Sequence, residues 1–127
     1  FWLSETPHVP GSRLPGVNNP RMVTWVQFKE LATGAEFLLY NTHLDHESQY
    51  AREIGAQMLF YHVALTTRAW GLPAIVTSDM NAPPSIPAIH ILMGTAEVSP
   101  LLYDAAEFLR KAKRFDRRYV PRLPRHA

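Results

Sequence analysis

The chain contains no cysteine, which excludes disulfide bonds, thiolate nucleophiles and cysteine-ligated zinc sites. It has no apolar run long enough to span a bilayer, and we expect no signal peptide within these residues. It also lacks a glycine-rich phosphate-binding loop, a nucleophilic serine motif and zinc-finger spacing. The first residue is not methionine, and the chain begins directly with strand-like sequence. We therefore expect the natural N-terminus to lie upstream. The chemistry that remains rests on carboxylate, amide and imidazole side chains.

Charge is distributed unevenly along the 127 residues, of which 46% are hydrophobic, as in a globular domain or a piece of one. Eight of the 13 Lys and Arg residues lie in residues 110–127, where Asp116 is the only acidic residue. This tail is either a binding segment for nucleic acid or another anionic surface, or a solvated, disordered end. Residues 1–109 are net acidic, which suits divalent cations better than naked polyanions. We therefore predict a part-domain over residues 1–109 and a separate basic tail.

The pattern of apolar residues predicts strands before and after one long helix. Strands are predicted at residues 1–6, 22–28, 36–42 and 73–78. The turn sequence ATGA at residues 32–35 predicts an antiparallel hairpin between the second and third strands. The order strand, helix, strand implies a crossover connection and a sheet that is covered by a helix.

The long helix is predicted over residues 47–70, where apolar residues recur every three or four positions, and it should end at Gly71. A shorter helix is predicted to begin with Ser85 as its cap and to run towards Gly94. The inner face of the long helix is expected to carry Ala51, Ile54, Met58, Tyr61 and Leu65.

Two of the predicted strands end in polar residues of the kind that catalytic sites use. One ends in the sequence NTHLDH at residues 41–46, and the other in SDMNA at residues 78–82. Polar groups at the ends of neighbouring strands can converge on one cleft from a rigid base. Asp79 and Asn81 share side-chain parity on an extended chain, so both can face that cleft. The structural alternatives are an Asx turn for this pair and a hydrogen-bonding role for His43.

These two motifs resemble the central motifs of the endonuclease/exonuclease/phosphatase superfamily, which has the deoxyribonuclease-I-like fold. The usual family forms are NTHLDH and GDFNA, so Ser78 stands where the family usually has glycine. The resemblance runs from Phe1 to about Ala105, and it implies part of a four-layer α/β sandwich with a mixed sheet covered by helices. Residues earlier in the chain also resemble the family. They are similar to the segment that precedes these motifs in one bacterial and fungal branch, and they comprise residues 1–7, 10–12, 20–21 and 24–25.

The resemblance implies a metal-dependent phosphoesterase in which water attacks a phosphodiester or a phosphomonoester in line. His43 would contact the scissile phosphate and donate a proton or a hydrogen bond. Asp79 would orient or deprotonate the attacking water, and Asn81 would hold a phosphate oxygen. Mg²⁺ or Mn²⁺ would neutralise the phosphate, and Asp79 is a candidate ligand for it.

Three more residues are candidates for binding the substrate, each with a structural alternative. Asn41 would brace the site, or would form ordinary hydrogen bonds at a strand end. Arg21 would pair with a phosphate, or would form a structural salt bridge. Asp45 would help to bind substrate or metal, or would cap the helix that follows it.

The chain lacks other parts of the family's site. The resemblance places the principal metal-binding Glu and an Asn before this chain, and a closing Asp-His pair beyond its end. A non-catalytic fragment or binding module is therefore the alternative to an enzyme. The isolated chain is expected to be a poor enzyme, and to associate through a bare sheet face that carries Val23, Trp25 and Ile75. Nucleic acid, inositol phosphate, sphingolipid and sugar phosphate all stay open as substrates.

Overall fold

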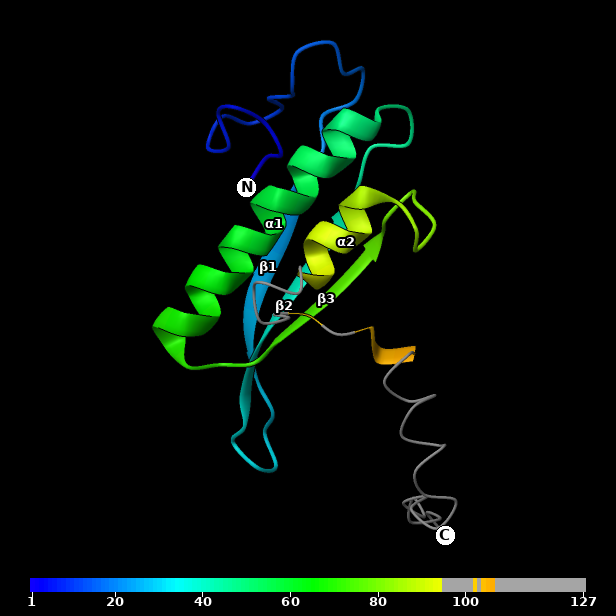
Figure 1. Ribbon diagram of the computed structural model, residues 1–127. Helices are drawn as coiled ribbons and strands as arrows, with labels where there is room; N and C mark the ends of the chain where they lie inside the picture. The colour runs from blue at the N-terminus through cyan, green and yellow to red at the C-terminus, as the bar shows by residue number, and fades with distance from the viewer. Residues whose placement is uncertain (95–101, 103, 107–127) are drawn as a thin grey trace, which may run out of the picture.

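A computed structural model describes residues 1–94, 102 and 104–106, and it has the α/β order that the sequence predicts (Figure 1). The basic tail and its predicted disorder lie outside these residues. The elements in chain order are β1 Val23–Lys29, β2 Glu36–His43, α1 Gln49–Trp70, β3 Ala74–Asp79 and α2 Pro87–Met93.

The three strands form one mixed sheet in the order β1-β2-β3. β1 and β2 pair antiparallel as the predicted hairpin, and Glu30 closes its turn by accepting from the backbone N–H groups of Ala32 and Thr33. β2 and β3 pair parallel, and α1 forms the predicted crossover between them. In this register His43, the last residue of β2, lies opposite Asp79, the last residue of β3.

Both helices cover the same face of the sheet, so the described residues form two layers (Figure 1). Ser48 caps the start of α1, and Gly71 ends it with a φ of 66°, a left-handed conformation that glycine adopts without strain. Neither helix within the described ranges combines the length and the apolar character that a bilayer crossing needs. The buried core between sheet and helices includes Val23, Leu38, Tyr40, Ala56, Leu59, Val63, Ala88 and Leu92.

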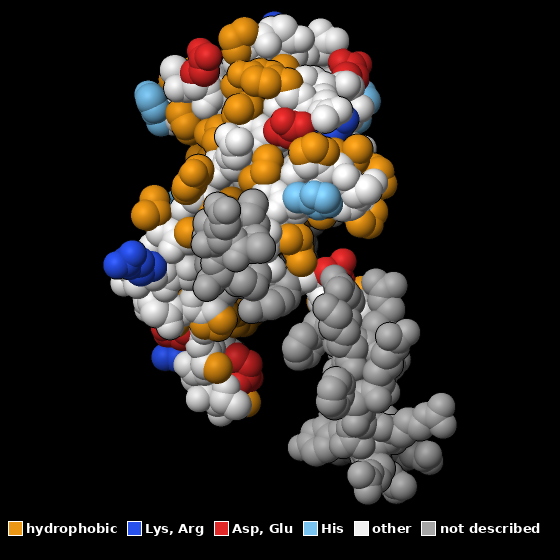
Figure 2. Space-filling view, viewed as in Figure 1, with side chains coloured by type: hydrophobic (Ala, Val, Ile, Leu, Met, Phe, Trp, Pro, Cys, Tyr) orange, Lys and Arg blue, Asp and Glu red, His pale blue; other side chains and the backbone are white. Residues whose placement is uncertain are grey.

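The inner face of α1 differs from the predicted one. Tyr61 and Leu65 are 65% and 69% exposed, and Figure 2 shows hydrophobic side chains scattered over this helix-bearing side of the molecule. The prediction holds for Ala51, which is buried, and for Ile54 and Met58, which pack against buried residues. It was wrong for Tyr61 and Leu65, because the large apolar residues of α1 are spread too widely around the helix to mark one face. Small residues let the helix lie close to the chain beneath it: a Cβ on Gly55 would lie 3.0 Å from Leu3 Cδ1. The buried residues of α1 are Ala51, Gly55, Ala56, Leu59 and Val63.

Two other local predictions were wrong. The predicted strand at residues 1–6 is a turn, because the Trp2 N–H donates to the Pro7 carbonyl at 2.8 Å. The segment pairs with the chain before β1 through one isolated antiparallel bridge, between Trp2 and Met22. Ser85 does not cap α2: the N-cap residue is Ile86, which makes no side-chain capping bond. Proline at the start of α2 explains the difference, since its fixed φ begins a helix without a capping side chain.

The second face of the sheet is not covered by any described element. Residues of β3 alternate between half-buried and exposed, and Ile75 is 49% exposed on this open face, as predicted. Val23 and Trp25 do not lie there, since Val23 is fully buried beneath the helices and Trp25 packs against the same core. Val26 and Phe28 take their places, because side chains alternate between the two faces of a strand.

A pair of leucine truncations on α1 tests the corrected inner face. Leu59→Ala should lower the free energy of unfolding by about 2–5 kcal/mol, because it leaves a cavity in the core. Leu65→Ala makes the same chemical change at an exposed position and should cost less than about 0.5 kcal/mol. Urea unfolding of both variants measures the difference, and equal losses would contradict the placement of α1 on the sheet.

Candidate active site

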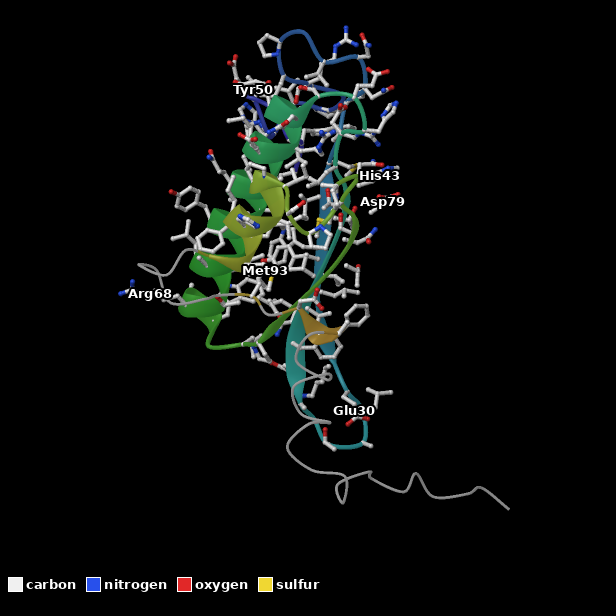
Figure 3. The ribbon with its side chains drawn as sticks, turned by 45° about the vertical axis from the view of Figure 1, so that its right-hand side comes forward. Glu30, His43, Tyr50, Arg68, Asp79 and Met93 are labelled. Atoms are coloured by element: carbon white, nitrogen blue, oxygen red, sulfur yellow. The ribbon has the colours of Figure 1, made fainter. Side chains whose placement is uncertain are left out.

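The candidate site consists of His43 and Asp79, which lie side by side at the ends of two parallel strands (Figure 3). His43 Nε2 lies 3.8 Å from Asp79 Oδ2. The side chains are 55% and 65% exposed, on the open face of the sheet. The predicted approach of these two residues is therefore present, and one bound anion or water could contact both.

Asn81 organises the chain directly after β3. Its φ of 47° is left-handed, a conformation that asparagine tolerates better than most residues. Its backbone N–H donates to Asp79 Oδ1 at 3.0 Å, and its Nδ2 donates to the Leu44 carbonyl at 2.9 Å. The Asx-type turn is thus present, and it holds the Asp79 carboxylate while tying the two strand ends together.

Asn41 lies two residues before His43 along β2, on the same open face of the sheet. Its Oδ1 accepts a hydrogen bond of 2.9 Å from the hydroxyl of Thr77, its register partner on β3. Sequence reasoning missed Thr77. Thr77 lies two residues before Asp79, so the sequence does indicate that both side chains lie on the same face of the strand. Its pairing with Asn41, however, depends on the register of two strands that are far apart in sequence.

Arg21 forms the salt bridge that was the alternative to substrate binding, whereas Asp45 does not cap α1, whose capping residue is Ser48. Arg21 Nε lies 3.7 Å from Asp45 Oδ2, and Arg21 Nη2 donates to His46 Nδ1 at 3.0 Å. The Asp45 side chain is 1% exposed, and its Oδ1 accepts from the backbone N–H groups of Glu47 and Ser48 at 2.9 and 2.7 Å. Asp45 therefore holds the loop after His43 and is not exposed to a ligand in this arrangement.

The electrostatics of Asp45 agree with this role. Burial alone would raise its pKa from the ordinary value of 3.8, but the N–H groups of Ser48 and Glu47 and the charge of Arg21 outweigh burial and lower the pKa. The ionised carboxylate is thus the form that the folded chain favours.

A hollow between β3 and α2 is separate from the predicted cleft around His43. This hollow, of about 550 Å³, lies along β3 towards α2, and its lining includes Val76, Met80, Ile89 and Leu92 but neither His43 nor Asp79. The site is therefore an open shelf at the strand ends. The side chains that face the hollow are mostly apolar, so it offers little to a phosphate group.

A complete metal site is not formed by the described residues either. Among them, no three His, Asp or Glu side chains gather closely enough to hold a metal ion. Asp79 offers one exposed carboxylate, whereas Mg²⁺ prefers six oxygen ligands, several of them water. The residues present would supply at most part of such a site.

The chain is similar to solved structures of endonuclease/exonuclease/phosphatase family proteins. An endonuclease/exonuclease/phosphatase family protein from Bacteroides thetaiotaomicron is 38% identical, with a TM-score of 0.68, over 72% of this chain and 33% of that one. A mannosyl-6-phosphatase from the same species is 38% identical, with a TM-score of 0.67, over 72% of this chain and 34% of that one. The human Nocturnin catalytic domain, at 20% identity and a TM-score of 0.60, shares the fold.

This chain thus spans about a third of the length of the structures it matches. No protein-family model and no curated protein matches it.

Replacing Asp45 by asparagine tests whether its ionised carboxylate holds the loop. Because the folded-state pKa lies below 3.8, the stabilisation is fully present above pH 3.8 and is lost as the pH falls through the folded-state pKa. Asp45→Asn should lower the free energy of unfolding by about 1–3 kcal/mol at pH 7, and by less at pH 3.

Thermal unfolding across this pH range measures the effect, and Glu5→Gln, at an exposed carboxylate, is the control. A loss that stays the same at pH 3 and pH 7 would show that charge plays no part.

Proposed function

We propose, on the premise that this chain belongs to the endonuclease/exonuclease/phosphatase superfamily and spans part of its domain, that it carries part of the active site of a phosphate-ester hydrolase. The observation that supports the proposal is the juxtaposition of His43 and Asp79 on one exposed sheet face, 3.8 Å apart. Surface histidines and aspartates that serve only solubility need no common face and no shared register.

Each residue has a role in the proposed reaction. Asp79 would accept a proton from water as the water oxygen attacks phosphorus, so its carboxylate must be ionised and accessible. Its Oδ1 is held by the Asn81 backbone N–H, which leaves Oδ2 on the side of His43. His43 would donate to the phosphate or leaving-group oxygen, on which negative charge grows as the P–O bond breaks. Asn81 Nδ2 donates one N–H to the Leu44 carbonyl, and its second N–H would be the donor to a phosphate oxygen.

The requirement for Mg²⁺ or Mn²⁺ stays part of this proposal. When bound, such an ion would neutralise negative charge on the phosphate. The described residues do not complete a site for it, so further ligands would have to come from chain outside them. We likewise propose that the open sheet face packs inside a four-layer α/β sandwich, because its exposed Val26, Phe28 and Ile75 would then be buried.

A sugar phosphomonoester is the first substrate to test. The mannosyl-6-phosphatase that is 38% identical to this chain carries that activity in its name. The Nocturnin match supports the fold alone, because its identity is 20%. Nucleic acid remains a second kind of substrate, and bis(p-nitrophenyl) phosphate is a suitable generic phosphodiester probe.

A non-catalytic fragment or binding module is the second candidate function. It is favoured by two observations: the chain spans about a third of its structural neighbours, and the described residues gather no metal-binding group of three side chains. Incubating the purified chain with Mg²⁺ or Mn²⁺ and either mannose 6-phosphate or the generic phosphodiester separates the two candidates. We expect the isolated chain to show little turnover and to associate, as measured by light scattering.

A monodisperse monomer with multiple-turnover activity that His43→Ala abolishes would show instead that this chain is a complete catalyst.

Asp79→Asn tests the proposed base in a protein that supplies the rest of the domain. The substitution keeps the shape of the side chain but removes its charge and its ability to accept a proton. Turnover should fall by about 10²–10⁴-fold, with the fold intact by circular dichroism. Glu36→Gln, at the opposite end of β2, is the matched control and should retain activity. Near-wild-type turnover of Asp79→Asn at saturating metal would rule out the assigned role.

A further inference from the structure

We infer that Thr77 is a positioning residue that fixes the side-chain amide of Asn41 beside the His43–Asp79 pair. The inference rests on the proposed phosphoesterase site and extends it to a residue whose side chain does not itself contact the substrate.

The open face of the sheet carries successive rows of side chains across the strands. The row at the strand ends is His43 and Asp79, and the row before it on the same face is Asn41 and Thr77. Rows on one face are two residues apart, which is about 6.5–7 Å along a strand. A phosphate group bound at His43 and Asp79 would therefore lie within reach of a hydrogen-bond donor on Asn41.

The Thr77 hydroxyl orients the Asn41 amide. Its single proton is shared between two acceptors, Asn41 Oδ1 at 2.9 Å and the Tyr40 carbonyl at 3.2 Å, and the shorter contact is the one to Asn41. The bond to Oδ1 turns the carbonyl end of the Asn41 amide towards β3. The Nδ2 group, with two N–H donors, is then the end that remains for a ligand, and N–H donors are what an anionic phosphate oxygen accepts from.

Thr77 also anchors itself to the backbone of the strand that carries Asn41. Its second acceptor, the Tyr40 carbonyl, belongs to β2, and the Tyr40 side chain is fully buried in the core. An exposed asparagine without such a neighbour would sample several rotamers, and ordering it on binding costs free energy. Thr77 would lower this cost by holding the amide before the ligand arrives.

The alternative is that threonine stands here only because β-branched residues suit strands. Thr77→Val separates the two explanations, since valine keeps the β-branched shape and removes the hydroxyl. Thr77→Ser keeps the hydroxyl and should behave as wild type. Thr24→Val is the matched control, because Thr24 is the register partner of Asn41 on its other side, in β1.

The first measurement needs no ligand and uses the ¹⁵N-labelled chain. Thr77→Val should shift the Asn41 side-chain NH₂ resonances and lower their order parameter, whereas Thr77→Ser and Thr24→Val should leave them close to wild type. Unfolding temperatures confirm that every variant is folded. Unchanged Asn41 resonances in folded Thr77→Val would overturn the inference.

The second measurement is a titration with inorganic phosphate, followed at His43 and Asn41. Thr77→Val should weaken binding about 3–10-fold, the effect of one neutral hydrogen bond, and Thr77→Ser should restore it. Equal affinity of wild type and Thr77→Val would overturn the inference, because Thr77 would then be structural only. Failure of the wild type to bind phosphate at His43 would contradict the proposed function, while the Asn41 resonances would still decide whether Thr77 orients the amide.

Discussion

The parallel pairing of β2 with β3 is the constraint on which the candidate site depends. These strands are separated in sequence by α1, and their register places His43 opposite Asp79. A shift of one residue would move one of the two side chains to the helix-covered face. The register is held by burial, because Leu38 and Tyr40 of β2 enter the core while Asn41 and His43 point the other way.

The same alternation explains why the sheet has two such different faces. On the helix-covered face, the buried Thr42 hydroxyl donates to the Met22 carbonyl at 2.8 Å. On the open face, apolar side chains such as Val26 and Ile75 lie towards one end, and the polar rows lie towards the strand ends. The apolar part of this face is a surface that packing against another layer would bury, and the polar part at the strand ends is a site that water and substrate would reach.

Several polar residues near the site are structural, and this sharpens the functional assignment of the others. Asp45 is committed to backbone N–H groups and to Arg21, and Asn81 ties the end of β3 to Leu44. Because these groups are already paired, His43 and Asp79 remain as the exposed pair to which the proposed acid–base chemistry is assigned. The loop contacts serve that pair by limiting how far the two strand ends can move apart.

The sequence by itself determined the three central strands, the long helix with its end at Gly71, and the family motifs that contain His43 and Asp79, because local periodicity, turn chemistry and short motifs are written in neighbouring residues. It did not determine which face of α1 is buried, that residues 1–6 form a turn, that Asp45 is shielded from solvent, or that Thr77 meets Asn41. Each of these depends on contacts between segments far apart in the chain. Only the tertiary structure decides them, because the energy of such a contact depends on register and packing, and neither is encoded at a single position.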